Sequence, residues 1–115
     1  MVIDDDPSVR KAIRRLLRTA QMDARTCASG ESFLASTLDR EPDCLVLDIR
    51  MPGMTGPELR DRLLDARRLI PIVFITAHDV GEEGTAGCTG TILHKPFEDQ
   101  ALLDAIRQAV EDGSA

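Results

Sequence analysis

The stretch Cys44-Leu45-Val46-Leu47-Asp48 decides the fold of this chain. Four apolar residues without a polar interruption are typical of a short strand that is buried on both faces, as in a parallel sheet covered by helices on both sides. A single carboxylate, Asp48, ends the run. We therefore expect an α/β domain with Asp48 at the carboxyl edge of the sheet, where open α/β sheets bind ligands.

Three further apolar runs end in the same way, each beside a charged residue or a hydroxyl. They are Val2-Ile3 before Asp4-Asp5-Asp6, Ile72-Val73-Phe74-Ile75 before Thr76, and Ile92-Leu93 shortly before Lys95. Because the carboxyl ends of parallel strands share one edge, we expect carboxylates, a hydroxyl and an ammonium group to converge there.

Helical patterns separate these strands. Pro7 suits a first helical position after an Asp6 cap, and apolar residues follow at helical spacing. Ser29 is expected to cap the next helix, and Leu64 is expected to face inward in the third. The remaining elements expected are a strand over 23–27 and helices over 31–38, 58–69 and 99–110.

The segment between Thr76 and Lys95 departs from this alternation. Glycine recurs at every third position from 81 to 90 with almost no large apolar residue, which disfavours a helix. We expect the fourth helix of the fold to be stunted or absent.

Composition limits the classes of protein that fit. The 115 residues suffice for one domain, 43% of them are apolar, and the net charge of −6 argues against direct nucleic-acid binding. No apolar run approaches a membrane span, and three cysteines without a CxxC pair favour free thiols in the cytoplasm. We expect a cytoplasmic domain that binds neither membrane nor nucleic acid.

The expected cluster has a definite chemistry. Asp4, Asp5 and Asp48 would repel one another by about 4 kcal/mol per pair at 4 Å and an effective dielectric near 20. A divalent, oxygen-preferring cation such as Mg²⁺ would relieve that repulsion. With Lys95 and the Thr76 hydroxyl beside it, Asp48 could attack a phosphorus and form an aspartyl phosphate. The chain has no glycine-rich phosphate loop, so a bound nucleotide is not implied.

Four motifs, in order, carry a resemblance to a known family. The chain resembles the receiver domain of two-component response regulators over essentially its whole length, and it looks most like the FixJ-like branch. The motifs are VIDDDPS (2–8), LVLDIRMPGMTG (45–56), IVFITAH (72–78) and HKPF (94–97). The resemblance implies a flavodoxin-like (βα)5 three-layer sandwich with parallel sheet order 2-1-3-4-5, one receiver domain over 1–115, and no output domain in this chain.

The resemblance also implies a role for each site residue, and a partner. The protein would be a signalling switch rather than an enzyme, accepting a phosphoryl group from a sensor histidine kinase. The implied roles are Asp48 as phosphoacceptor, Asp5 as direct and Asp4 as water-mediated Mg²⁺ ligand, the Arg50 backbone carbonyl as a further ligand, Thr76, Ala77 and Lys95 as phosphate-binding switch residues, and a cis Lys95–Pro96 peptide.

One residue departs from the family pattern. An aromatic residue usually stands three positions before the lysine and swings inward on activation, but this chain has Ile92 there. An alternative is therefore a degenerate receiver that acts as a constitutive scaffold or homodimer. A second alternative is an aspartyl-nucleophile phosphatase, because Asp4-x-Asp6 weakly resembles the opening motif of that family.

Overall fold

A five-stranded parallel sheet forms the centre of the computed structural model, which describes residues 1–36, 40–76 and 91–114, with the side chains of 113 and 114 left out. The sheet order is β2-β1-β3-β4-β5, which confirms the predicted order. Crossovers connect the strands, because parallel neighbours cannot be joined by tight hairpins. The strands are β1 (Val2–Ile3), β2 (Thr26–Cys27), β3 (Leu45–Asp48), β4 (Ile72–Thr76) and β5 (Ile92–His94).

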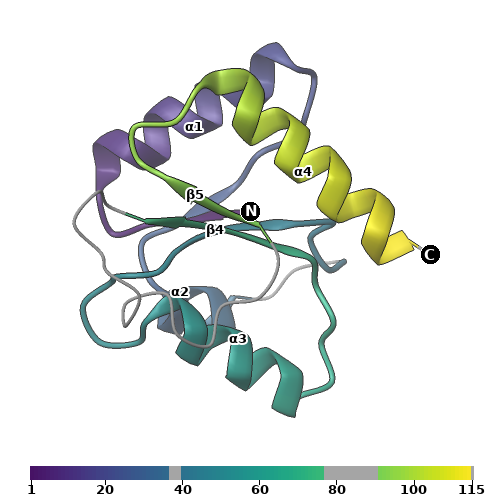
Figure 1. The fold of residues 1–115 in the computed structure, drawn as a ribbon. Coiled ribbons are helices and arrows are strands. Elements are labelled where there is room, and N and C mark those ends of the chain that lie inside the picture. Colours follow the sequence, from purple (N-terminus) through teal and green to yellow (C-terminus); the bar gives the residue numbers. More distant parts are fainter. Residues whose placement is uncertain (37–39, 77–90, 115) are drawn as a thin grey trace.

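Helices cover both faces of the sheet and complete a three-layer sandwich (Figure 1). α1 and α4 lie on one face, and α2 and α3 lie on the other. This arrangement confirms the predicted flavodoxin-like class. The helices are α1 (Pro7–Thr19), α2 (Gly30–Ala35), α3 (Gly56–Asp65) and α4 (Asp99–Ser114).

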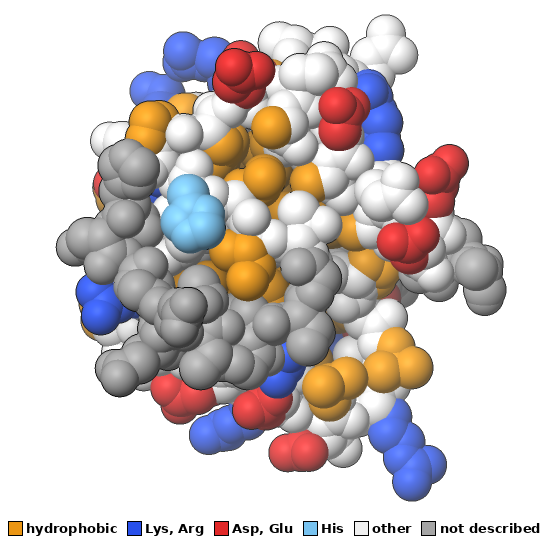
Figure 2. Space-filling model, in the orientation of Figure 1, with side chains coloured by type: hydrophobic (Ala, Val, Ile, Leu, Met, Phe, Trp, Pro, Cys, Tyr) orange, Lys and Arg blue, Asp and Glu red, His pale blue; other side chains and the backbone are white. Residues whose placement is uncertain are grey.

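Two hydrophobic clusters, one on each face, follow from the strand period of two. In β3, Val46 packs toward the α1 and α4 side, whereas Leu45 and Leu47 pack toward the α2 and α3 side. All four residues of β3 are buried, as the uninterrupted apolar run predicted. The outer surface is mixed: hydrophobic side chains gather on the face that β5 and α4 form, with charged side chains around them (Figure 2).

Helix starts agree with the sequence signals. The Asp6 side chain accepts a hydrogen bond from the Ser8 amide and caps α1, and Ser29 caps α2. Thr55 and Glu58 form a capping box at the start of α3.

Helix ends and one helix face differ from expectation. α3 ends at Asp65, four residues early, and Arg67 has φ 59°, outside the helical region. The inward orientation predicted for Leu64 is wrong, since 49% of this residue is exposed. The helix buries Leu59 and Leu63, four residues apart, and the next residue lies about 100° further around the axis.

The bounds of three other elements also differ from the predicted ones. α2 ends at Ala35, β2 is limited to Thr26–Cys27, and α4 continues to Ser114 instead of ending near 110. The stunted or absent fourth helix was predicted for a segment within residues 77–90, which lie outside the described residues. In the part of the chain that is described, no helix is long and apolar enough to cross a membrane.

Candidate functional site

Three carboxylates meet at the carboxyl edge of the sheet. Asp4 directly follows β1 and Asp48 ends β3, and these two strands are paired neighbours. One oxygen each from Asp4, Asp5 and Asp48 can be chosen so that all three lie within 4.8 Å of one another. Asp4 and Asp48 are buried, whereas Asp5 is exposed. Clustered carboxylate oxygens of this kind suit Mg²⁺, which binds through one or two carboxylates and keeps water and phosphate oxygens as other ligands.

Lys95 supplies a positive charge to this cluster. Its Nζ lies 2.9 Å from Asp4 Oδ2 and 3.8 Å from Asp48 Oδ2. The backbone carries the lysine there, because the Lys95 amide donates to the Thr76 carbonyl at 2.7 Å and extends the pairing of β4 with β5. The Lys95–Pro96 peptide is cis, as expected.

Asp4 and Asp5 stand in different surroundings. Both Asp4 oxygens already accept hydrogen bonds, Oδ1 from the Asp6 amide at 2.9 Å and Oδ2 from Lys95. Asp5 is solvent-exposed. The difference supports Asp5 as the direct ligand and Asp4 as a water-mediated one, although both assignments stay predictions.

The carboxyl of Asp48 has a raised pKa. Burial, and to a smaller extent the neighbouring Asp4 carboxylate, raise the pKa of its carboxyl to about 7 against the opposing effect of Lys95. The Arg50 amide donates to Asp48 Oδ1 at 3.3 Å. A bound cation would favour the ionised carboxylate, the form needed for nucleophilic attack.

Thr76 presents an unused polar atom at the end of β4, next to β3. Thr76 is fully buried, and its Oγ1 has no hydrogen-bond partner among the described residues. An unsatisfied buried hydroxyl costs about 1–3 kcal/mol, so a phosphoryl oxygen would be a favourable partner. Ala77, the other predicted switch residue in this strand's extension, lies outside the described residues.

Two predicted features lie outside the cluster. Asp6 caps α1 and is not among the three clustered carboxylates, which leaves the phosphatase-like Asp4-x-Asp6 pair incomplete. Ile92 is half-buried in β5 and packs against the core on the α2 and α3 side. Its effect on switching stays a prediction.

Sequence reasoning missed two contacts around the cluster. Arg10 Nη1 donates to the Asp4 carbonyl at 2.7 Å, and Glu31 Oε1 accepts from the Met54 amide at 2.9 Å. Periodicity assigns Arg10 to the polar side of α1 and gives no sign that its side chain reaches a backbone carbonyl. A contact between residues 31 and 54 has no local signal at all.

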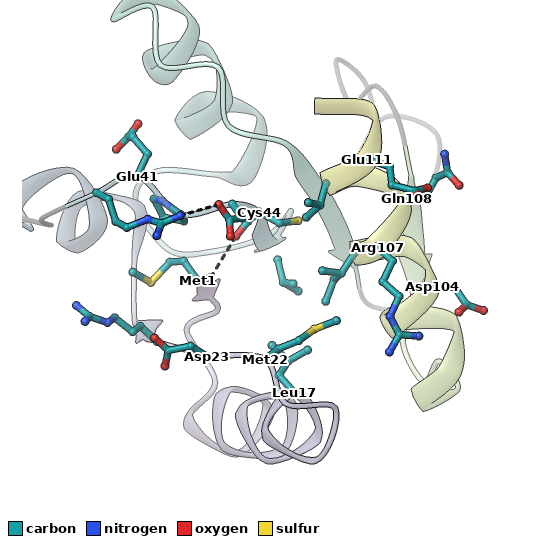
Figure 3. A pocket seen from close by; sticks show the side chains of 17 residues that line it. Met1, Leu17, Met22, Asp23, Glu41, Cys44, Asp104, Arg107, Gln108 and Glu111 are labelled. Carbon is teal, nitrogen blue, oxygen red and sulfur yellow. Dashed lines mark hydrogen bonds and ion pairs between the residues drawn. The ribbon is translucent and has the colours of Figure 1, made fainter. Parts of the chain in front are cut away.

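A cavity lies away from this cluster. A space of about 950 Å³ opens at the amino edge of the sheet, between α1 and α4 (Figure 3). Met1, Met22 and Cys44 contribute to its lining, and Arg107 and Glu111 bring charges of both signs. The cavity contains none of the predicted site residues.

Comparison with known proteins gives one consistent family. The response regulator receiver domain family matches residues 1–107. Nodulation protein W of Bradyrhizobium diazoefficiens is 38% identical over 113 residues, and the transcriptional regulatory protein FixJ of Rhizobium meliloti is 37% identical over 113 residues. Each alignment covers 96% of this chain, but only 50% of the nodulation protein and 55% of FixJ.

Solved structures agree. The crystal structure of FixJ-N superposes with a TM-score of 0.85 at 34% identity, covering 96% of this chain and 90% of that one. The structure of the response regulator StyR superposes with a TM-score of 0.85 at 45% identity, covering 98% of this chain and 59% of that one. Sequence, sheet order and the acidic cluster at the carboxyl edge therefore lead to one conclusion: the chain belongs to the receiver domain family of two-component response regulators.

Proposed function

We propose that Asp48 is the phosphoacceptor of this receiver, and that Mg²⁺ and a phosphorylated histidine kinase are its cofactor and donor. One observation carries the proposal: Asp48 is a buried carboxylate that clusters with Asp4 and Asp5 and lies 3.8 Å from the Lys95 ammonium. Receiver domains of this family bind Mg²⁺ in an acidic pocket and receive phosphoryl groups from histidine kinases.

The proposed reaction moves one phosphoryl group twice. An Asp48 carboxylate oxygen attacks the phosphorus, an O–P bond forms, and the N–P bond to the kinase histidine breaks with its electron pair left on the imidazole. Water later attacks the phosphorus, which releases inorganic phosphate and restores the carboxylate. A bound Mg²⁺ would neutralise charge on the phosphoryl oxygens.

Other residues of the chain act on the same group. Lys95 is placed to stabilise the charge that gathers on the phosphoryl oxygens. The Thr76 hydroxyl, which has no hydrogen-bond partner in the described part of the chain, is placed to donate to one of them. The Asp4 carboxylate, held by the Asp6 amide, keeps the lysine oriented.

Phosphorylation would then act as a signal. An aspartyl phosphate adds negative charge and new acceptor oxygens at the edge that carries Thr76 and Lys95, which biases the conformation of that edge. The chain spans about half the length of the curated relatives it matches. We further propose that the domain works in the cytoplasm as a signalling switch and does not turn over external substrates.

The test is mass spectrometry after treatment with acetyl phosphate and Mg²⁺. We expect one phosphoryl group on the wild-type chain, located on Asp48, and none on Asp48→Ala. Asp43→Ala is the matched control, because Asp43 precedes the same strand at the opposite edge of the sheet. A phosphoryl group on another residue, or an unmodified wild type, would disprove the assignment.

A homodimer is proposed as the form that a phosphorylated sample adopts. The hydrophobic side chains on the face of β5 and α4 would be buried in it (Figure 2). Light scattering before and after beryllofluoride addition tests this, and a mass that stays monomeric in both states would contradict it.

A further inference from the structure

The loop between β3 and α3, residues 49–55, is held by a side chain from a different helix. Glu31 lies in the first turn of α2, and its Oε1 accepts a hydrogen bond from the Met54 amide at 2.9 Å, across 23 residues of sequence. A carboxylate that accepts from a backbone N–H makes a charge-assisted hydrogen bond, which is about twice as strong as a neutral one.

The contact is closely packed on both sides. Gly53 has φ 78°, and a Cβ at that position would lie 3.4 Å from Glu31 Oε2. A Cβ on Gly30 would lie 2.9 Å from the sulfur of Met54, so the methionine side chain would have to shift. The glycines therefore let the first turn of α2 and the middle of the loop approach each other directly.

This loop forms one wall of the phosphorylation site. It begins right after Asp48, and its Arg50 donates an amide hydrogen bond to Asp48 Oδ1. Its far end is also fixed, because the Gly56 amide donates to the Ile49 carbonyl at 2.9 Å and Thr55 caps α3. Glu31 supplies an anchor between these two ends.

We propose that Glu31 is a positioning residue for phosphorylation: by holding the Met54 amide, it fixes the backbone around Arg50 in the geometry that receives Mg²⁺ beside Asp48. The inference rests on the proposed function of Asp48. Glu31 does not touch the reacting atoms, and it acts through the loop.

The experiment compares Glu31→Ala, which removes the acceptor, with Glu31→Gln, which keeps an acceptor oxygen but no charge. Glu41→Ala is the matched control, because Glu41 also makes side-chain hydrogen bonds across a long sequence distance, to Arg68 at 2.9 and 2.6 Å, but at the other edge of the sheet. Three quantities are measured: hydrogen exchange of the Met54 amide in metal-free protein, Mg²⁺ affinity by calorimetry, and phosphorylation by acetyl phosphate.

In Glu31→Ala we expect Met54 exchange to rise about tenfold and Mg²⁺ affinity to fall about tenfold, as is typical when a residue that orients a metal site is lost. The phosphorylation rate should recover at saturating Mg²⁺. Glu31→Gln keeps a neutral hydrogen bond about half as strong, so it should show a loss of about threefold in Met54 protection and Mg²⁺ affinity, between wild type and Glu31→Ala. Glu41→Ala should match wild type.

Three results would overturn the inference while Asp48 phosphorylation stands: wild-type Mg²⁺ affinity in Glu31→Ala, an equal loss in Glu31→Gln, which would indicate a charge effect, or an equal loss in Glu41→Ala. A wild-type chain that is not modified on Asp48 would instead overturn the proposed function, and this inference with it.

Discussion

The two edges of the sheet differ in what they offer a ligand. The amino edge has a space of about 950 Å³, lined by apolar side chains and by charges of both signs (Figure 3). Among residues 1–36, 40–76 and 91–114, the carboxyl edge brings together three carboxylates, the Lys95 ammonium group and the Thr76 hydroxyl, which has no hydrogen-bond partner there. We therefore base the proposed functional edge on the convergence of charged groups and not on the volume of a cavity.

The two edges also differ in the chemistry of a buried group whose pKa is raised. Burial raises the pKa of both Asp48 at one edge and the Cys44 thiol at the other. At Asp48 the pKa of the carboxyl comes close to neutral pH, and the neighbouring Lys95 favours the ionised form. At Cys44 burial raises the pKa of the thiol to about 11, so the reactive thiolate is scarce at neutral pH. The contrast can be tested at each edge.

The largest effect is expected from Lys95→Ala. Losing a charged donor to the phosphoryl oxygens should lower the rate of phosphorylation by acetyl phosphate by about 10²–10³-fold. Arg107→Ala removes a cation from the amino edge and should leave the rate unchanged. The measurement is a time course by mass spectrometry, with circular dichroism to confirm that both variants fold. Equal losses in the two variants would remove the distinction between the edges.

A smaller effect concerns Cys44. Because burial raises the pKa of its thiol to about 11, the native protein at pH 8 should react with iodoacetamide at Cys44 about a hundredfold more slowly than the urea-unfolded chain. Peptide mass spectrometry at timed intervals measures both rates. Fast native labelling would show that the amino edge also holds an activated group.

Asp48→Asn should stabilise the metal-free protein in a pH-dependent way. The folded pKa near 7 exceeds the unfolded value of 3.8, so the favourable contribution of protonated Asp48 is complete below 3.8 and is lost as the pH rises through 7. The substitution removes this loss. The free energy of unfolding should therefore exceed that of wild type by on the order of 4 kcal/mol at pH 8, and by little at pH 4.

Urea unfolding at a series of pH values measures this difference. Asp43→Asn, which alters an exposed carboxylate paired with Arg40 at the amino edge, is measured beside it as the control. A pH-independent gain in Asp48→Asn would contradict the raised pKa.

The smallest effect is expected from Thr76→Val, with opposite signs in two measurements. Removing an unpaired buried hydroxyl should raise the free energy of unfolding by about 1 kcal/mol in the metal-free protein. It should also weaken beryllofluoride binding, measured by fluorine NMR, because one donor to the phosphoryl mimic is gone. A loss of stability would indicate that the hydroxyl is satisfied in the free protein.

Local patterns predicted much of this molecule. The run of residues 44–47 predicted a strand buried on both faces, and Asp6 and Ser29 predicted the starts of α1 and α2, because capping and apolar alternation involve neighbours in sequence. The end of α3 and the exposure of Leu64 could not be predicted as well, since a helix stops where its packing against the sheet stops.

The sequence by itself determined the fold class, the strand order through the family resemblance, and the set of polar residues that end each strand. Only the tertiary structure decided that Lys95 pairs with Asp4, that Arg10 binds the Asp4 carbonyl, and that Glu31 holds the Met54 amide. Strand ends are set by short-range apolar patterns, whereas these contacts join residues from different elements, whose distances depend on how the helices settle on the sheet.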